Sequence, residues 1–144
     1  MASTTESYIE GALAWAFDRL GSKEYPMLCY AFLEDAYELG NNIELDGQGC
    51  TAKEAADAYG AQPGLPPRGS YVFYDSFGTI HDEYRNWGHI GLSLGDGRVI
   101  HAWDMVLVDD MLAVEQLAPA PGWSAPSYLG WAPAERILEG MKPR

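Results

Sequence analysis

The segment from Trp87 to Trp103, WGHIGLSLGDGRVIHAW, limits the possible folds more than any other part of the chain. Two short apolar runs flank Gly95-Asp96-Gly97, and an Asp-Gly pair accepts the positive φ angles that a tight hairpin turn requires. The segment therefore predicts an antiparallel hairpin. Its strands carry His89 and His101 near their outer ends, so the pairing brings two of the three histidines close enough for one imidazole to touch the other.

Helical patterns precede this hairpin, and further strand patterns surround it. Apolar residues recur at helical spacing in the first half of the chain, where Ser3 with Glu6 and Thr51 with Glu54 have the spacing of capping boxes. Short aromatic and β-branched runs follow the breaker segment PGLPPRG. We expect helices at 3–20, 26–39, 51–59 and from 133, strands at 70–75, 89–94, 98–103, 105–110 and 127–133, and a polar loop at 76–86. Helices followed by antiparallel strands indicate an α+β fold.

The composition describes a globular chain with an acidic surface. With 144 residues and 47% hydrophobic residues, we expect a single domain over residues 1–144. The net charge of −12 argues against nucleic acid or an anionic membrane as a partner. The N-terminal MASTTESYIE has neither the basic start nor the apolar region of a signal peptide, and no run is long enough to span a bilayer. We therefore expect a cytoplasmic protein, or one exported without a cleavable signal peptide.

Cys29 is the candidate nucleophile. It falls in the first turn of the helix expected from Pro26, where the helix dipole favours an anion and lowers the pKa of a thiol. With a histidine beside it as base, and a second polar group that orients this histidine, the residues of a cysteine hydrolase are present. Two other interpretations stay open: Cys29 as a small core side chain, and a metal site on His89 and His101, for which no further residue has suitable ligand spacing. We expect no metal and no cofactor.

Four segments resemble the NlpC/P60 family of bacterial cysteine peptidases. GHIGLSLGDGRVIHA resembles the histidine-bearing hairpin of that family, PRGSYVFYDSFG the strand before it, CYAFLEDAYELG the nucleophile helix and SYLGWAPAERIL the closing strand, over roughly residues 14–138. The resemblance implies a papain-like α+β domain whose N-terminal helices pack on an antiparallel sheet. It also implies that Cys29 is the nucleophile, that His89 is the general base and that His101 orients His89. Tyr25 matches the family's oxyanion tyrosine.

The resemblance implies hydrolysis of an amide through a thioester acyl-enzyme, at a γ-D-glutamyl bond of a peptidoglycan stem peptide or of a fragment of it. The chain departs from the family at the nucleophile, where Leu28 and Tyr30 replace the Asp and Ser of Asp-Cys-Ser-Gly. Two alternatives therefore stay open. One is the same machinery used as a hydrolase or acyltransferase on a non-peptidoglycan acyl substrate, and the other is a non-catalytic binding module of the same fold. The sequence also leaves open an inhibitor or immunity protein as partner.

Neighbouring residues complete the set of candidates. Trp87 and Trp103 flank the two histidines, and we expect them to form walls of a cleft. Asp104 follows His101 closely and is a candidate partner for it, although a solvated acid at a strand end is the commoner role. His81 matches nothing in the family motif, and we expect it to be solvated.

Overall fold

The computed structural model describes residues 4–144, so Ser3 of the first expected capping box lies outside the described residues. The elements are α1 Thr5–Phe17, α2 Cys29–Asn41, β1 Ile43–Glu44, α3 Ala52–Tyr59, β2 Tyr71–Asp75, β3 Phe77–Ile80, β4 Glu83–Asn86, β5 His89–Ser93, β6 Arg98–Ala102, β7 Val106–Asp110, the 3₁₀ helix η1 Ala113–Gln116, β8 Ser127–Ala132, α4 Ala134–Ile137 and β9 Lys142–Pro143. Helices with an antiparallel sheet confirm the α+β class. In the described part of the chain, no helix is both long and apolar enough to cross a membrane.

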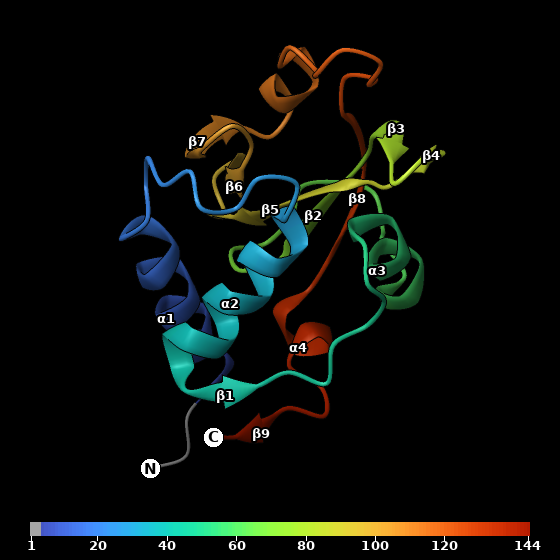
Figure 1. The fold of residues 1–144 in the computed structure, drawn as a ribbon. Coiled ribbons are helices and arrows are strands. Elements are labelled where there is room, and N and C mark those ends of the chain that lie inside the picture. The colour runs from blue at the N-terminus through green and yellow to red at the C-terminus, as the bar shows by residue number, and fades with distance from the viewer. Residues whose placement is uncertain (1–3) are drawn as a thin grey trace.

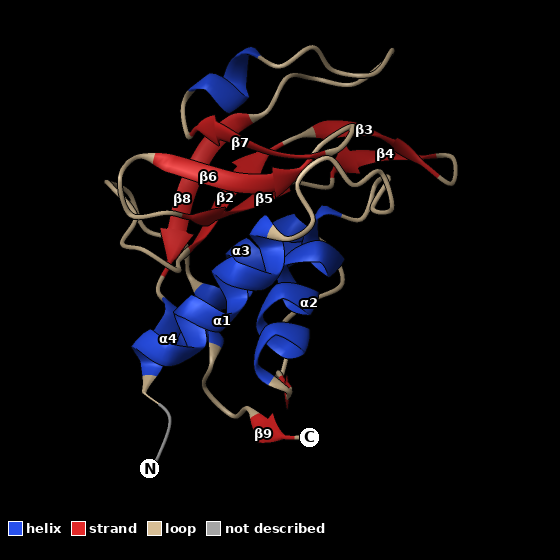
Figure 2. Ribbon diagram, turned by 90° about the vertical axis from the view of Figure 1, so that its left-hand side faces the viewer, coloured by secondary structure: helices blue, strands red, loops and turns tan. Residues whose placement is uncertain are grey.

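A five-stranded antiparallel sheet of order β7-β6-β5-β2-β8 forms the centre of the molecule. One face packs against the α-helices through a large apolar cluster that includes Phe32, Ile90 and Ile100. The other face carries a smaller cluster, with Tyr74 and Val114, beneath η1. Figure 2 shows the α-helices below the sheet and the 3₁₀ helix above it. Figure 1 shows the N-terminal end of α2 directed at β5, which places the first residue of this helix at the sheet.

The predicted β5–β6 hairpin is present, with a short ladder. Leu92 pairs with Ile100, and Ser93 pairs with Val99. The ladder between β5 and β6 ends at Leu92 and does not reach His89. On its other edge β6 pairs with β7 from end to end. On its other edge β5 pairs with β2 from His89 to Leu92, so only the backbone groups of its first residues that face β6 have no ladder partner.

The helices α1 and α3 each begin directly after a threonine that caps the N-terminus. Thr4 accepts a hydrogen bond from Ser7 N, and Thr51 accepts one from Glu54 N, as the N-cap of α3. The predicted starts of these helices, at residues 3 and 51, therefore lie within two residues of the observed starts at Thr5 and Ala52. Helix α1 ends at Phe17, three residues before the predicted end at residue 20.

The start of α2 differs from the prediction. The sequence predicted a helix from Pro26, but Met27 has a φ of +59° and Leu28 has a φ of −120°, so neither is helical. The helix begins at Cys29. The predicted position of Cys29 in the first turn is thus confirmed. Cys29 is the first residue of the helix and not the fourth.

Residues 76–86 also differ from the prediction, which gave them as a polar loop. They contain the two-stranded ribbon of β3 and β4, whose turn residues His81 and Asp82 have φ angles of +51° and +64°. A polar, largely exposed ribbon lacks the apolar alternation from which strands are predicted. Trp123 packs on it so closely that a Cβ at Gly78 would lie 1.9 Å from the indole ring. His81 is exposed at the turn, as expected.

Candidate active site

Three side chains form a continuous chain of polar contacts across three neighbouring strands. Nε2 of His89, the first residue of β5, lies 2.8 Å from Nδ1 of His101 in β6. Nε2 of His101 lies 2.8 Å from Oδ2 of Asp109 in β7. His101 is fully buried and His89 is nearly so. The predicted contact between the two imidazoles is therefore confirmed, and Asp109 extends it by one residue.

The acid at the end of this chain determines where each proton lies. An ionised Asp109 only accepts hydrogen bonds, so His101 carries its proton on Nε2 and leaves Nδ1 as an acceptor. His89 then donates its own Nε2 proton to His101. The remaining nitrogen of His89, Nδ1, has a free lone pair. This is the tautomer that a general base requires, since its proton-accepting nitrogen is not used within the chain.

Both imidazoles are held in the neutral form. Burial lowers the pKa of His89 well below its ordinary value, and the neighbouring His101 acts in the same direction. Burial also lowers the pKa of His101, although Asp109 opposes that effect. At neutral pH His89 is therefore ready to accept a proton.

Cys29 lies beside the start of β5. The backbone amides of Ile90, the residue after His89, and of Tyr30 and Cys29 itself act to lower the pKa of its thiol. The side chain is half-buried and lines the same pocket as His89. The first residue of α2 and the first residue of β5 thus bring a thiol and an imidazole to one place.

The protonation state of Cys29 corrects the expectation from the sequence. Burial raises the pKa of the Cys29 thiol to about 11, and the hydrogen bonds from the amides of Ile90, Tyr30 and Cys29 offset only part of this effect. The helix N-terminus was expected to lower the pKa, and that expectation is wrong because desolvation outweighs it. The resting pair is a neutral thiol and a neutral imidazole.

The neutral state of the Cys29 thiol predicts how the rate of its alkylation by iodoacetamide depends on pH. Only the thiolate reacts, so the rate at Cys29 should rise about tenfold per pH unit between about pH 7 and 10, below a pKa of about 11. The rate is followed by mass spectrometry in a Cys50→Ser background, because Cys50 is the other free cysteine. A rate that is already constant from neutral pH upward would show a thiolate–imidazolium pair instead.

A pocket of about 630 Å³ opens in front of these groups. The predicted cleft residues Trp87 and Trp103 both line it, together with Trp123. The ring of Trp103 packs edge-on against the ring of His89, with centroids 5.1 Å apart. The indole nitrogen of Trp87 donates to Gly78 O at 2.9 Å. Tryptophan rings held in this way give the pocket a rigid apolar wall.

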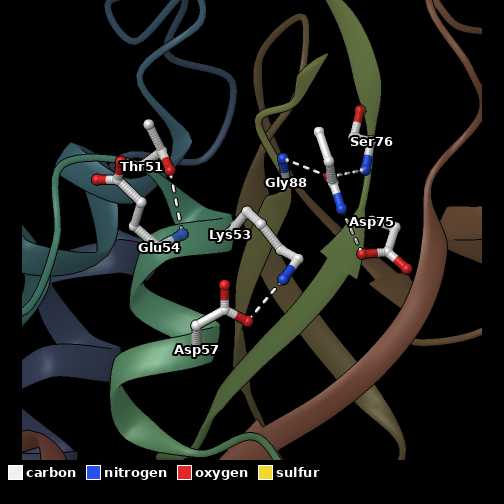
Figure 3. A network of polar contacts seen from close by, with 8 residues as sticks. Thr51, Lys53, Glu54, Asp57, Asp75, Ser76 and Gly88 are labelled. Carbon is white, nitrogen blue, oxygen red and sulfur yellow. Dashed lines mark hydrogen bonds and ion pairs between the residues drawn. The ribbon is translucent and has the colours of Figure 1, made fainter.

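A polar network fixes the backbone just before His89. Asn86 accepts hydrogen bonds from the amides of Ser76 and Gly88 at 2.9 and 3.1 Å and donates to Asp75 at 2.6 Å. Figure 3 shows these bonds beside the first turn of α3. The amide of Lys53 in that turn donates to Trp87 O at 3.1 Å. The start of β5 is therefore tied both to the end of β2 and to α3.

Gly88 is required at this point, and its replacement by alanine should be costly. Its φ is +76°, and a Cβ would lie 2.5 Å from the backbone nitrogen of Lys53. We expect Gly88→Ala to lower the free energy of unfolding by about 2 kcal/mol or more and to slow reaction at Cys29. Urea unfolding measures the first effect.

Gly97→Ala is the matched control for Gly88→Ala. Gly97 has a similar φ of +90°, but nothing lies within 4 Å of a Cβ there. The backbone strain is shared, so only the close approach to α3 differs between the two variants. Equal losses of stability in both would show that this approach is unimportant.

The structure places Tyr25 away from the pocket. Its hydroxyl donates to Asp35 at 2.7 Å, and its ring packs edge-on against Phe32 with centroids 5.2 Å apart. Tyr25 is not among the residues that line the pocket around Cys29. The assignment of Tyr25 to the oxyanion site is therefore corrected, because the side chain of Tyr25 packs against α2 and not at the pocket.

Asp109, and not Asp104, is the carboxylate that contacts His101. Asp104 lines the pocket, whereas Asp109 reaches His101 diagonally from β7. The register could have indicated this, because His101 pairs with Leu107, which shares a face with Asp109. That register depends on the turn closed by Trp103 N and Met105 O, and Trp-Asp-Met carries no turn signal. Among residues 4–144, no group of three or more His, Cys, Asp or Glu side chains is placed to hold a metal ion.

Comparison with known proteins adds no assignment to this geometry. No protein-family model matches the chain, and no curated protein matches it. A functional proposal therefore depends on the chemistry of the site and on the resemblance of the individual segments.

Proposed function

We propose that the chain is a papain-like cysteine hydrolase of the NlpC/P60 type, which cleaves an acyl bond through a thioester on Cys29. The observation that supports this most is the contact chain from His89 through His101 to Asp109, which ends at a pocket that Cys29 also lines. A structural role for two neutral, buried histidines would not require one nitrogen of His89 to remain free in a pocket that Cys29 also lines. The non-catalytic binding module leaves this arrangement unexplained.

The reaction follows from the resting protonation states. As Sγ of Cys29 attacks the carbonyl carbon, its proton moves to Nδ1 of His89, and the resulting imidazolium is stabilised through His101 by the charge of Asp109. When the tetrahedral intermediate collapses, the bond from carbon to the leaving nitrogen breaks, and His89 returns its proton to that nitrogen. Water then attacks the thioester with His89 again as the base. The acid is released, and the proton returns to the Cys29 sulfur.

The oxyanion is stabilised by backbone amides at the start of α2. The first amides of a helix have no acceptor within the helix, and Cys29 is the first residue of α2. These donors and the helix dipole point at the place where negative charge develops. No tyrosine is needed, in keeping with the position of Tyr25.

Two substrate classes remain in this proposal. By resemblance the first is the γ-D-glutamyl bond of a peptidoglycan stem peptide or its fragment. The second is a non-peptidoglycan acyl group, taken by a hydrolase or acyltransferase. One observation favours the second: none of the described residues that line the pocket is Lys or Arg, so no cation there would pair with the carboxylates of a stem peptide.

Trapping the acyl-enzyme tests the proposal. With p-nitrophenyl acetate, we expect a burst of p-nitrophenol and one acetyl group on Cys29, detected by mass spectrometry of the acid-quenched protein. Cys50→Ser is the matched control, since Cys50 lines the same pocket and should be dispensable. Cys29→Ser should remove the burst. Acetylation of Cys50 alone, or none at all, would support the binding module.

Soluble muropeptides then separate the two substrate classes. Their cleavage, followed by mass spectrometry, would assign the family substrate. A protein that forms the acetyl-enzyme but leaves muropeptides intact would belong to the second class.

A further inference from the structure

The pocket holds one ionisable group that the proposed reaction does not use. Glu34 lies on α2, five residues after Cys29, and lines the same pocket. Within residues 4–144 it has neither a hydrogen-bond partner nor an ion-pair partner. Neighbouring carboxylates do have such partners: Asp35 accepts from Tyr25, and Glu38 accepts from Leu45 N at 2.8 Å. The carboxylate oxygens of Glu34 are not among the buried polar atoms that lack a partner, so this group is open to a ligand cation in the pocket.

The electrostatic surroundings of Glu34 are acidic. Burial raises the pKa of Glu34 to about 7, and the charges of Glu38 and Asp35 act in the same direction. The other charged side chain that lines the pocket is Asp104, also an acid. The net charge of −12 adds a long-range field of the same sign. The site therefore attracts cations and repels anions.

The lining of the pocket is mostly apolar. Five residues of helix separate Cys29 and Glu34 by about 7 to 8 Å along the axis of α2 and by about 140° around it, a span comparable to the length of an extended lysine side chain. The pocket walls include Trp87, Trp103 and Ala52. Aliphatic stems pack well against such walls, and tryptophan faces attract ammonium and guanidinium groups.

We propose that the pocket selects an acyl substrate with a long apolar stem that ends in an ammonium or guanidinium group, and that Glu34 binds this group. The inference rests on the proposed function, since it concerns the substrate of that same site. Glu34 is a specificity residue and takes no part in the proton transfers.

A binding experiment tests this without turnover. The probes are hexylammonium, hexan-1-ol and hexanoate, which share one stem and differ in charge. Each is titrated at about pH 8, where Glu34 is mostly ionised and an alkylamine is protonated. The readout is protection of Cys29 from iodoacetamide in the Cys50→Ser background, which gives a dissociation constant for each probe.

We expect hexylammonium to bind about fivefold or more tightly than hexan-1-ol, and hexanoate to bind most weakly. Glu34→Gln should remove the advantage of hexylammonium and leave hexan-1-ol unchanged. Glu10→Gln is the matched control, because Glu10 is exposed on α1 and its loss changes the net charge equally. This control should keep the preference.

Three results would overturn the inference. They are equal or tighter binding of hexan-1-ol or hexanoate, protection by none of the three probes, and an unchanged preference in Glu34→Gln. The wild-type comparison of the three probes stands by itself if Glu34→Gln does not fold. A protein that never forms an acyl-enzyme but prefers hexylammonium would overturn the proposed function and leave the cation site in place.

Discussion

Cys29→Ala is expected to lower kcat/KM by about ten-thousand-fold or more, measured with p-nitrophenyl acetate or with a cleaved muropeptide. The thiol forms the covalent bond, and alanine supplies no nucleophile in its place. The loss should not come from unfolding, because Cys29 is a half-buried first residue of α2 and alanine is a good helix former. Circular dichroism and urea unfolding of the variant check this.

A double-mutant comparison sharpens this expectation. His89→Ala alone should cost a similar factor, and the Cys29→Ala/His89→Ala double variant should be within about tenfold of either single variant, since the two groups act as one unit. Cys50→Ala should keep the wild-type rate. Residual activity of Cys29→Ala above a few per cent, or losses that multiply in the double variant, would contradict a thiol–imidazole mechanism.

The hairpin and its two histidines were predictable because short-range signals determine them. Asp96-Gly97 sets the turn, with Gly97 at a φ of +90°, and side-chain alternation then puts His89 and His101 on one face. The helical position of Cys29 was predictable to within a turn from the apolar spacing. These features depend on neighbours within about a dozen residues.

Other features depend on long-range packing, which a single sequence does not display. The start of α2 is delayed by the left-handed Met27, for which the sequence gives no signal. The raised pKa of Cys29 results from burial against β5, about 60 residues along the chain, and it reverses an expectation based on the helix terminus alone. Asp109 was missed for a different reason: it lies only eight residues after His101, but the turn between β6 and β7 carries no sequence signal that would set the register.

Asp109→Asn tests the part of the site that the sequence did not reveal. The side-chain amide that this substitution introduces can donate to Nε2 of His101, and His101 would then carry its proton on Nδ1 and donate it to Nε2 of His89. His89 would in turn be protonated on Nδ1, the nitrogen that must accept the thiol proton. We expect kcat to fall by about a hundredfold, with little change in the unfolding free energy. Asparagine keeps the size of the side chain and one acceptor oxygen.

The tautomers themselves distinguish this mechanism from a general structural effect. In the wild-type protein, ¹⁵N NMR of the imidazoles should show protonated Nε2 on both His89 and His101, and in Asp109→Asn it should show protonated Nδ1 on both. Asp110→Asn is the matched control, since Asp110 is the next residue of β7, and its carboxylate accepts from Leu112 N at 2.9 Å, away from the histidines. That variant should keep both the tautomers and the rate. Wild-type activity in Asp109→Asn, or a loss of rate with unchanged tautomers, would show that Asp109 does not set the proton positions. The buried pair of histidines would then have to hold the reactive tautomer of His89 by itself.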